Sequence, residues 1–317
     1  MRLEQVREHA ADLTAAMNSV IEGKPAVVST AAMVLLAEGH LLVEDVPGVG
    51  KTMLAKTLAR SIDCTVRRVQ FTPDLLPSDI TGVSVFNQDL RDFEFRPGAI
   101  FANVVVGDEI NRASPKTQSA LLECMEEGQV TVDGQTYVLP SPFIVMATQN
   151  PIEMEGTYPL PEAQRDRFMA RISMGYPSNN SEMDMLAHHG QTSPLDQLRP
   201  VVDAATVRAM IVAIRSLYVA DAIRQYIVDI AAETRRSEAL RLGASPRATL
   251  HMLRAARAHA ALAGRDHVLP DDVQAVAGPV LAHRLLTTGE TQAARRSPTD
   301  VLTDLISGIR IPVPRRQ

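Results

Sequence analysis

The sequence predicts an α/β fold, in which a parallel sheet is sandwiched between helices and carries inserted β-hairpins, followed by a small all-helical domain. Three observations lead to this prediction. Short apolar runs alternate with helical segments in the first half, two stretches there have hairpin patterns, and helical patterns fill the second half. The 317 residues are 45% hydrophobic, which is enough for one large core or two smaller ones.

Five short runs are predicted to be strands, because nearly continuous apolar runs are typical of strands buried on both faces of a parallel sheet. These runs are 40–44, 65–71, 103–108, 143–148 and 171–176. The segments between them suit the right-handed helical crossovers that join parallel strands. A helix is expected before the first strand, where apolar residues recur at steps of three and four from Leu3 to Val20.

Two stretches are predicted to be β-hairpins inserted into this α/β layer. In 83–95, apolar residues alternate on both sides of a polar turn, and in 129–139 the pair Asp133-Gly134 separates two alternating runs. Asp-Gly favours tight hairpin turns because both central residues need a positive φ. Since loops on a rigid scaffold often carry function, we expect the hairpins to contact partner proteins.

From about residue 176 the pattern changes to connectors and helices. Proline at 246 and 270 is expected near helix starts, where it is tolerated. The predicted helices are 203–218, 221–240, 246–263 and 270–286. We therefore expect an α/β core at 1–176 and a linker with a helical domain at 177–317.

Composition narrows the classes of function. The net charge is −5, whereas proteins that bind nucleic acid nonspecifically usually carry a net basic face. The two cysteines, Cys64 and Cys124, lie far apart without metal-like spacing, which fits a reduced, cytoplasmic chain. We expect neither a secretory signal nor a membrane span, because the apolar stretches are interrupted.

Residues 44–52, with the sequence EDVPGVGKT, form a candidate phosphate-binding loop between a predicted strand and a predicted helix. Gly48 and Gly50 would let backbone N–H groups turn inward around phosphate oxygens. Lys51 could reach the β- and γ-phosphates, and Thr52 could offer its hydroxyl to Mg²⁺. The start of the following helix adds a field that favours anions.

Polar residues end two further predicted strands. Asp108 is placed to hold Mg²⁺ through water, and Glu109 is placed to polarise a water for attack on the γ-phosphate. The fourth predicted strand ends in polar Thr148, Gln149 and Asn150, which could position that water. Because ligands bind outside the carboxyl ends of strands in such folds, the sequence predicts a nucleotide site there.

With these residues, the chain resembles the AAA+ ATPases, and specifically the MoxR family. The resemblance covers nearly the whole chain. It is densest in QFTPDLLPSDITG (70–82), FRPGAIFANVVVGDEINRASPKTQSALLECMEEGQVTVDG (95–134), FIVMATQNPIEMEGTYPLPEAQRDRF (143–168) and GASPRA (243–248). Family members also commonly carry aspartate where Asp45 replaces the leading glycine of the loop.

The resemblance implies ATP and Mg²⁺ as cofactors and a role for each candidate residue. Residues 48–52, Val49 included, look like the Walker A motif, Asp108 and Glu109 look like Walker B, and Asn150 looks like sensor 1. Members of the family typically assemble as hexameric rings. Many act with a partner that carries a von Willebrand factor A domain.

Three arginines are implicated in the same way. Arg167, before the fifth predicted strand, looks like the arginine finger that enters a neighbour's site. Arg165 stands where an apolar residue is more usual, which leaves open whether Arg165 or Arg167 is the finger. Arg247, in SPRA, looks like sensor 2 on the helical lid, and we expect it to reach the nucleotide of its own subunit. The hairpins at 83–95 and 129–139 are similar to the insert in helix 2 and to the hairpin before sensor 1.

The leading hypothesis is a MoxR-type ATPase that couples ATP hydrolysis to chaperone-like remodelling, maturation or activation of a protein or complex. The alternative is an ATPase subunit of a metal-chelatase-like assembly, with a nucleic-acid motor as a further possibility. A GTPase would need the guanine-reading Asn-Lys-x-Asp motif, which the sequence lacks. A small-molecule kinase would not need the two inserted hairpins.

Overall fold

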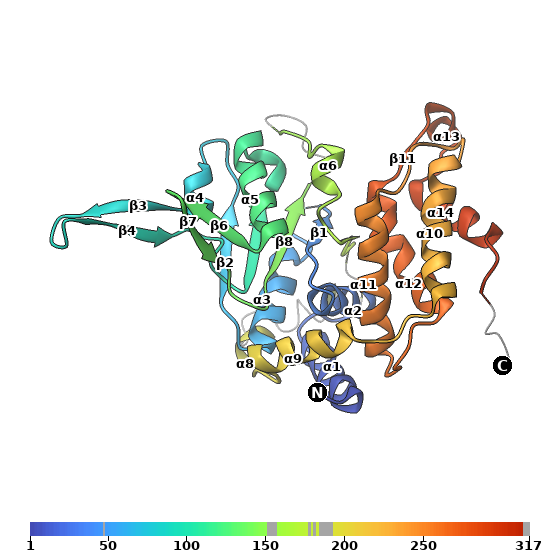
Figure 1. The fold of residues 1–317 in the computed structure, drawn as a ribbon, viewed down its shortest axis with the longest axis horizontal. Helices are drawn as coiled ribbons and strands as arrows, with labels where there is room; N and C mark the ends of the chain where they lie inside the picture. Colours follow the sequence, from blue (N-terminus) through green and yellow to red (C-terminus); the bar gives the residue numbers. More distant parts are fainter. Residues whose placement is uncertain (47, 151–156, 177–178, 180–181, 184–192, 313–317) are drawn as a thin grey trace.

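A computed structural model describes residues 1–46, 48–150, 157–176, 179, 182–183 and 193–312 (Figure 1). A central parallel sheet has the strand order β2-β5-β8-β1-β9. The strands are β1 (Leu41–Glu44), β2 (Val66–Gln70), β5 (Val104–Asp108), β8 (Ile144–Gln149) and β9 (Ala170–Ile172). All five correspond to predicted strands, although β9 is shorter than expected and starts at residue 170. Because every pair is parallel, all carboxyl ends meet at one edge of the sheet.

Alternate residues of the strands face two separate hydrophobic clusters, as the period of two in a strand requires. Leu41 and Val43 pack into the cluster that contains the N-terminal helices, whereas Leu42 packs into the cluster on the opposite face. The first face carries α1 (Leu3–Asn18), α2 (Pro25–Leu36) and α3 (Lys51–Ser61). The second face carries α4 (Pro77–Thr81), the short helix η1 (Ile110–Arg112) and α5 (Pro115–Glu127).

Both predicted hairpins are present. The first pairs β3 (Gly82–Asn87) with β4 (Asp92–Pro97), and the second pairs β6 (Gln129–Val132) with β7 (Gln135–Val138). In the second turn Asp133 has φ 50° and Gly134 has φ 78°, the positive values that the Asp-Gly pair predicts. The β3–β4 hairpin projects far from the rest of the molecule (Figure 1).

The second half is mainly helical, as the sequence predicts. Its helices are α8 (Pro194–Gln197), α9 (Ala204–Arg215), α10 (Asp221–Arg236), α11 (Pro246–Leu262), α12 (Pro270–Leu281), η2 (Ala282–Arg284), α13 (Gly289–Ala293) and α14 (Pro298–Gly308). A short helix α6 (Glu162–Arg165) precedes β9. Pro246 and Pro270 occupy first helical positions, where a missing N–H costs little.

One departure from an all-helical lid is a small antiparallel sheet of β10 (Leu240–Leu242) and β11 (Leu286–Thr287). Helices expected to reach 240 and 286 therefore end at 236 and 281. Apolar periodicity did not reveal these ends. The residues that follow α10 and α12 form backbone hydrogen bonds between β10 and β11 instead of continuing the helices.

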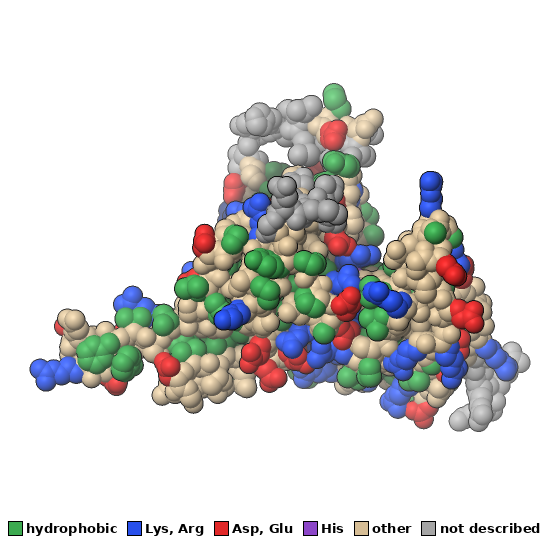
Figure 2. Space-filling model, turned by 90° about the horizontal axis from the view of Figure 1, so that it is seen from above, with side chains coloured by type: hydrophobic (Ala, Val, Ile, Leu, Met, Phe, Trp, Pro, Cys, Tyr) green, Lys and Arg blue, Asp and Glu red, His purple; other side chains and the backbone are tan. Residues whose placement is uncertain are grey.

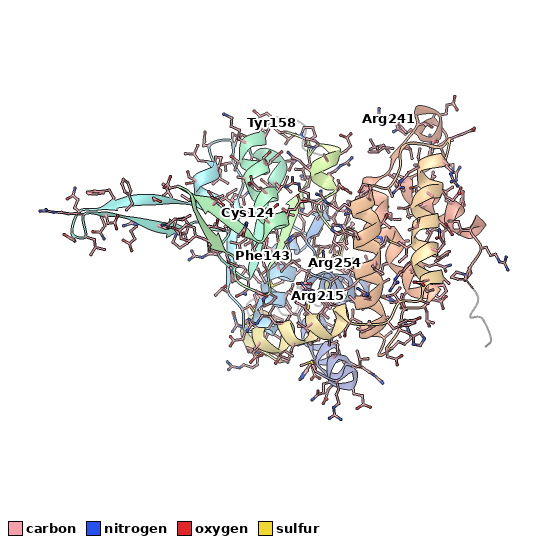
Figure 3. The ribbon with its side chains drawn as sticks, viewed as in Figure 1. Cys124, Phe143, Tyr158, Arg215, Arg241 and Arg254 are labelled. Carbon is pink, nitrogen blue, oxygen red and sulfur yellow. The ribbon has the colours of Figure 1, made fainter. Side chains whose placement is uncertain are left out.

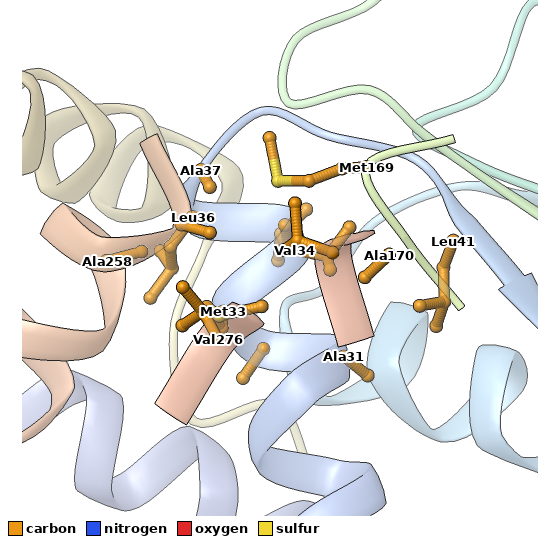
Figure 4. Close-up of a cluster of buried hydrophobic side chains, with 14 of the residues drawn as sticks. Ala31, Met33, Val34, Leu36, Ala37, Leu41, Met169, Ala170, Ala258 and Val276 are labelled. Carbon is orange, nitrogen blue, oxygen red and sulfur yellow. The ribbon is translucent and has the colours of Figure 1, made fainter. Parts of the chain in front are cut away.

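A single hydrophobic cluster joins the helices of the first half to those of the second. Figure 4 shows Val34 of α2 near Ala170 of β9 and near Met169, which precedes that strand, and it shows Leu36 of α2 near Ala258 of α11. All of these side chains are buried. The helical lid is therefore packed firmly on the α/β core. Among the described helices, none combines the length and apolar character that crossing a lipid bilayer requires.

Candidate functional site

The candidate phosphate-binding loop lies between the end of β1 and the start of α3. Gly48 has φ 84° and Gly50 has φ 90°, so both occupy the left-handed region that favours glycine. A Cβ at Gly48 would meet no atom within 4 Å, so backbone conformation rather than space requires glycine there. The first N–H groups of α3 lack helical partners and, with the helix dipole, favour an anion at this point.

Asp45 points away from the phosphate-binding loop. Its Oδ2 accepts hydrogen bonds from the Ser173 hydroxyl at 2.8 Å and from the Gly175 N–H at 2.6 Å, and its Oδ1 accepts one from the Val46 N–H. Burial would raise the pKa of Asp45, but these donors more than offset it, and the pKa lies below its usual value. The carboxylate therefore anchors the loop to the chain after β9, which explains how the loop tolerates an aspartate.

Lys51 and Thr52 lie at the start of α3, on the side of the loop that faces β5. The Lys51 ammonium donates to the Asp45 carbonyl oxygen at 2.6 Å. The Thr52 hydroxyl donates to Asp108 Oδ2 at 3.4 Å. Two oxygen groups from the loop and from β5 thus converge, as a Mg²⁺ site requires.

Asp108 and Glu109 stand at the carboxyl end of β5, beside the end of β8. The Thr148 hydroxyl donates to Asp108 Oδ1 at 3.3 Å and accepts a hydrogen bond from the Glu109 N–H at 2.9 Å. Glu109 has φ 58°, a left-handed conformation that is unfavourable for glutamate and that is typical of functional sites. The strand ends therefore fix the Asp108 carboxylate and the backbone of Glu109.

Asn150 follows β8 at the same edge and is buried. Its carbonyl oxygen accepts a hydrogen bond from the Asn111 side chain at 3.5 Å. The structure thus brings Lys51, Thr52 and the β5 carboxylates together with the end of β8, as the sequence predicts from the parallel topology.

Two residues of β2 also reach this site, and the sequence reasoning missed both. The Gln70 amide donates to Glu109 Oε2 at 3.1 Å, and Arg68 Nε donates to Asp108 Oδ2 at 2.6 Å. The only sequence signal was the period of two, which places residues 68 and 70 on one face of the strand. That signal becomes informative once β2 is known to pair with β5.

Arg167 and Arg247 lie together at the opposite, amino-terminal edge of the sheet. Arg167 pairs with Glu126 at 3.4 Å, and Arg247 pairs with Glu126 and, at 3.8 Å, with Asp166. Both arginines line a cavity of about 600 Å³ with His40, which precedes β1. Phe143, which precedes β8, and Arg215 and Arg254 line the same cavity (Figure 3).

The expectation that Arg247 reaches its own subunit's nucleotide is wrong. The strands β1, β2, β5 and β8 have four to six residues each. They separate the two edges of the sheet by roughly 13–20 Å, which is beyond the reach of an arginine side chain. The physical reason is that α12 packs against β9 and α11 against α2, which holds the start of α11 on the amino-terminal side. Arg247 therefore lies beside Arg167 and not over the phosphate-binding loop.

A buried arginine ties this region of the core to the lid. The Arg284 side chain is 2% exposed and donates to Asp166 Oδ1 at 2.8 Å and to the Phe168 carbonyl at 2.6 Å. The Ser245 hydroxyl, which caps α11, also donates to Asp166. Burial and the charge of Arg284 lower the pKa of His251 to about 2. Neutral His251 thus offers Nδ1 as an acceptor to Arg284 at 2.6 Å.

Comparisons with known proteins show the class to which this chain belongs. Residues 40–170 match the family model described as "ATPase family associated with various cellular activities (AAA)", and residues 232–305 match the AAA lid domain. A Cytophaga hutchinsonii structure described as a candidate ATPase superposes with a TM-score of 0.90 and 36% identity, covering 98% of this chain and 97% of that one. The fold and the site thus define a P-loop ATPase of the AAA+ class.

Relatives that match this chain along most of their length show to which family of AAA+ ATPases it belongs. Bacillus subtilis YeaC is 48% identical over 94% of this chain and 93% of its own length. The Mycobacterium tuberculosis protein named Chaperone MoxR1 is 42% identical over 92% of this chain and 80% of its own, and Paracoccus denitrificans MoxR is 32% identical over 96% of each. The chain belongs to the MoxR family of AAA+ ATPases.

Lys51→Ala is expected to lose nucleotide binding. Lys51 is the one side-chain cation within residues 44–52, where it must offset Glu44 and Asp45 as well as the triphosphate. Equilibrium binding of a fluorescent ATP analogue measures the effect. Lys56→Ala, on the same helix, is the matched control and should bind normally. Wild-type affinity in Lys51→Ala would show that this loop is not the nucleotide site.

Proposed function

We propose that the chain is a Mg²⁺-dependent ATPase that couples ATP hydrolysis to chaperone-like remodelling, maturation or activation of a protein or complex. The observation that carries this proposal is the convergence of Thr52, Asp108 and Glu109 beside the phosphate-binding loop. The name of the Mycobacterium tuberculosis relative, which is called a chaperone, supports the remodelling role.

The residues at the loop fit a magnesium nucleotide. Thr52 and Asp108 present a hydroxyl and a carboxylate, which are hard oxygen ligands of the kind that Mg²⁺ takes together with phosphate oxygens and water. Bound there, Mg²⁺ would neutralise charge on the β- and γ-phosphates. Lys51 and the N–H groups of the loop would hold the phosphates. Glu109 would orient and polarise the attacking water, with Asn150 beside it.

We propose that a neighbouring subunit completes each site. Arg167 and Arg247 share Glu126 at the edge of the sheet that is remote from their own phosphate-binding loop. Two arginines held on one carboxylate form a surface that suits a triphosphate from outside the subunit. This arrangement supports a ring, for which we propose a hexamer, with Arg167 as the finger and Arg247 beside it in the same neighbour's site.

The β3–β4 hairpin is the surface that we propose for the protein client or for a von Willebrand factor A domain partner. Leu90 and Phe93 are 71% and 68% exposed, and Phe86 stacks edge-on against Phe93 across the strands. Figure 2 shows hydrophobic side chains gathered near the end of this projection. Exposed aromatic side chains on a projecting hairpin are typical of contact surfaces rather than of catalytic groups.

Replacing residues 87–92 with a short Gly-Ser turn is therefore expected to leave basal ATP hydrolysis unchanged and to abolish its stimulation by a partner. The matched control is Val212→Ser, which removes an exposed apolar side chain from α9, outside both hairpins. Steady-state ATPase assays with and without a von Willebrand factor A domain partner measure both effects. Unchanged stimulation in the hairpin variant would rule out this surface.

Two further proposals concern the domain boundary and the cellular location. We propose that the core and lid divide after residue 176; the two family models match on either side of that point. We also propose a cytoplasmic location, which the two separated free cysteines support.

The proposed function is tested by the ATPase activity of the purified chain. Hydrolysis should require Mg²⁺, stop in the presence of a chelator, and remain unchanged when single- or double-stranded DNA is added. Loss of activity only on adding a chelator would support the magnesium site. Strong stimulation by DNA would instead indicate a nucleic-acid motor and contradict the proposed class of client.

A further inference from the structure

Among the hydrogen bonds that the described residues make to Asp108, the carboxylate proposed to hold Mg²⁺, that of Arg68 is the shortest. Its Nε lies 2.6 Å from Asp108 Oδ2, the same oxygen that accepts the Thr52 hydroxyl at 3.4 Å. The Asp108 side chain is 8% exposed, whereas the Arg68 side chain is 56% exposed. A nearly buried carboxylate is thus paired with a guanidinium that retains a direct route to water.

The pairing follows from the position of Arg68 on β2. Residues 66–70 of this strand pair in register with 104–108 of β5, so Arg68 is opposite Val106. Residues 68 and 70 share one face, and from that face Gln70 bonds Glu109 while Arg68 extends to Asp108. Arg67 and Val69 lie on the other face. The β2 strand therefore supplies a cation to the metal-binding carboxylate.

A cation at this oxygen has a direct consequence for Mg²⁺. Oδ2 of Asp108 lies on the Thr52 side of the carboxylate, where a metal held by Thr52 and Asp108 would sit. A guanidinium hydrogen-bonded to that oxygen uses one of its lone pairs and repels a second cation. Because Arg68 is largely exposed, it can leave Asp108 without exposing a buried cavity.

We propose that Arg68 competes with Mg²⁺ for Asp108 and so sets the Mg²⁺ concentration at which the site fills. This inference rests on the proposed function of the site. Arg68 is a positioning residue in this role, since it acts through Asp108. Arg68 raises the Mg²⁺ concentration that nucleotide binding requires. The site therefore fills at higher free Mg²⁺ concentrations than it would if only Thr52 and Asp108 were present.

The test is a Mg²⁺ titration of the binding of a fluorescent, non-hydrolysable ATP analogue, which needs no turnover. In Arg68→Ala, the Mg²⁺ concentration at half-saturation should fall by about two- to fivefold, the range for releasing a partly exposed ion pair. Arg68→Lys retains a positive charge and should stay closer to wild type. Arg67→Ala, an equal change of charge on the opposite face of β2, should leave the midpoint unchanged.

The outcomes separate this inference from the proposed function. A wild-type chain that binds the analogue equally well with and without Mg²⁺ would overturn the magnesium site and, with it, the competition. A wild-type chain that depends on Mg²⁺ while Arg68→Ala has the same or a higher midpoint would overturn only the competition. A higher midpoint would mean that Arg68 supports the bound nucleotide. Thermal unfolding of each variant confirms that all are folded.

Discussion

Arg167→Ala is expected to bind ATP normally and to hydrolyse it about 10³–10⁵-fold more slowly, the loss typical of an arginine finger. The γ-phosphoryl transition state spreads negative charge over its oxygens, and in the proposed site Lys51 and Mg²⁺ would neutralise that charge only in part. Arg167 pairs with Glu126 at the edge of the sheet opposite to its own loop, so we propose that its charge serves a neighbour's nucleotide. Nucleotide affinity and single-turnover hydrolysis, measured separately, test the two halves of this prediction.

Mixing two inactive variants tests whether Arg167 of one subunit acts in the nucleotide site of its neighbour. Arg167→Ala has an intact loop, and Lys51→Ala has an intact finger, so mixed rings should contain some interfaces with both and regain part of the activity. Arg247→Ala should behave like Arg167→Ala in the same mixtures, because both arginines share Glu126. Arg165→Ala is the control for the neighbouring arginine. If mixed rings form and stay inactive, or if Arg167→Ala alone is fully active, the finger assignment is wrong.

Dilution of the wild-type protein gives an independent test of whether the active site is completed between subunits. A separate subunit should bind ATP yet hydrolyse it poorly, so the specific activity should rise with protein concentration as rings assemble. Wild type measured over a dilution series, alongside its size distribution, provides the comparison. Activity that is constant from monomer to ring would contradict a site completed between subunits.

Glu109→Gln is expected to bind ATP while its hydrolysis falls about 10²–10⁴-fold, the usual effect of removing a general base. The amide keeps the shape of the side chain but cannot polarise water. The Glu109 N–H, which the substitution keeps, donates to Thr148, and Gln70 contacts the side-chain oxygen, so little of the loss should come from misfolding. Glu123→Gln, an exposed carboxylate on α5, is the matched control.

Binding and turnover measured on the same Glu109→Gln preparation check this prediction. Near-normal turnover would remove Glu109 from the mechanism. If the prediction holds, the variant also retains ATP and stabilises the ATP-bound ring, which makes it the best bait for isolating the protein client.

The nucleotide site could be predicted from the sequence because each of its motifs lies within one short segment of the chain. The strand–loop–helix around Gly50 follows from residue types in one segment, and the meeting of Asp108 with Thr148 follows from parallel strands. Arg68 was missed because its role depends on which strand β2 pairs with. Residue types within β2 alone do not specify that pairing.

The position of Arg247 was predicted wrongly for a similar reason. Its place in a helix-starting SPRA segment is local, but the direction in which the lid faces is set by long-range packing of α11 and α12 on α2 and β9. Apolar stripes identify which face of each helix is buried. They do not show on which side of the sheet the lid comes to rest.

Arg284 fastens the lid to the core within one subunit. Its guanidinium donates to backbone carbonyls of Phe168 and Met169 in the core and of Val280 in the lid. Swinging the lid away from Asp166 would leave a buried charge without its partner, at a cost of about 3–5 kcal/mol. Lid and core of one subunit therefore move together, so in the ring that we propose any flexible joint would lie between subunits, where one subunit's arginines would meet the next subunit's nucleotide.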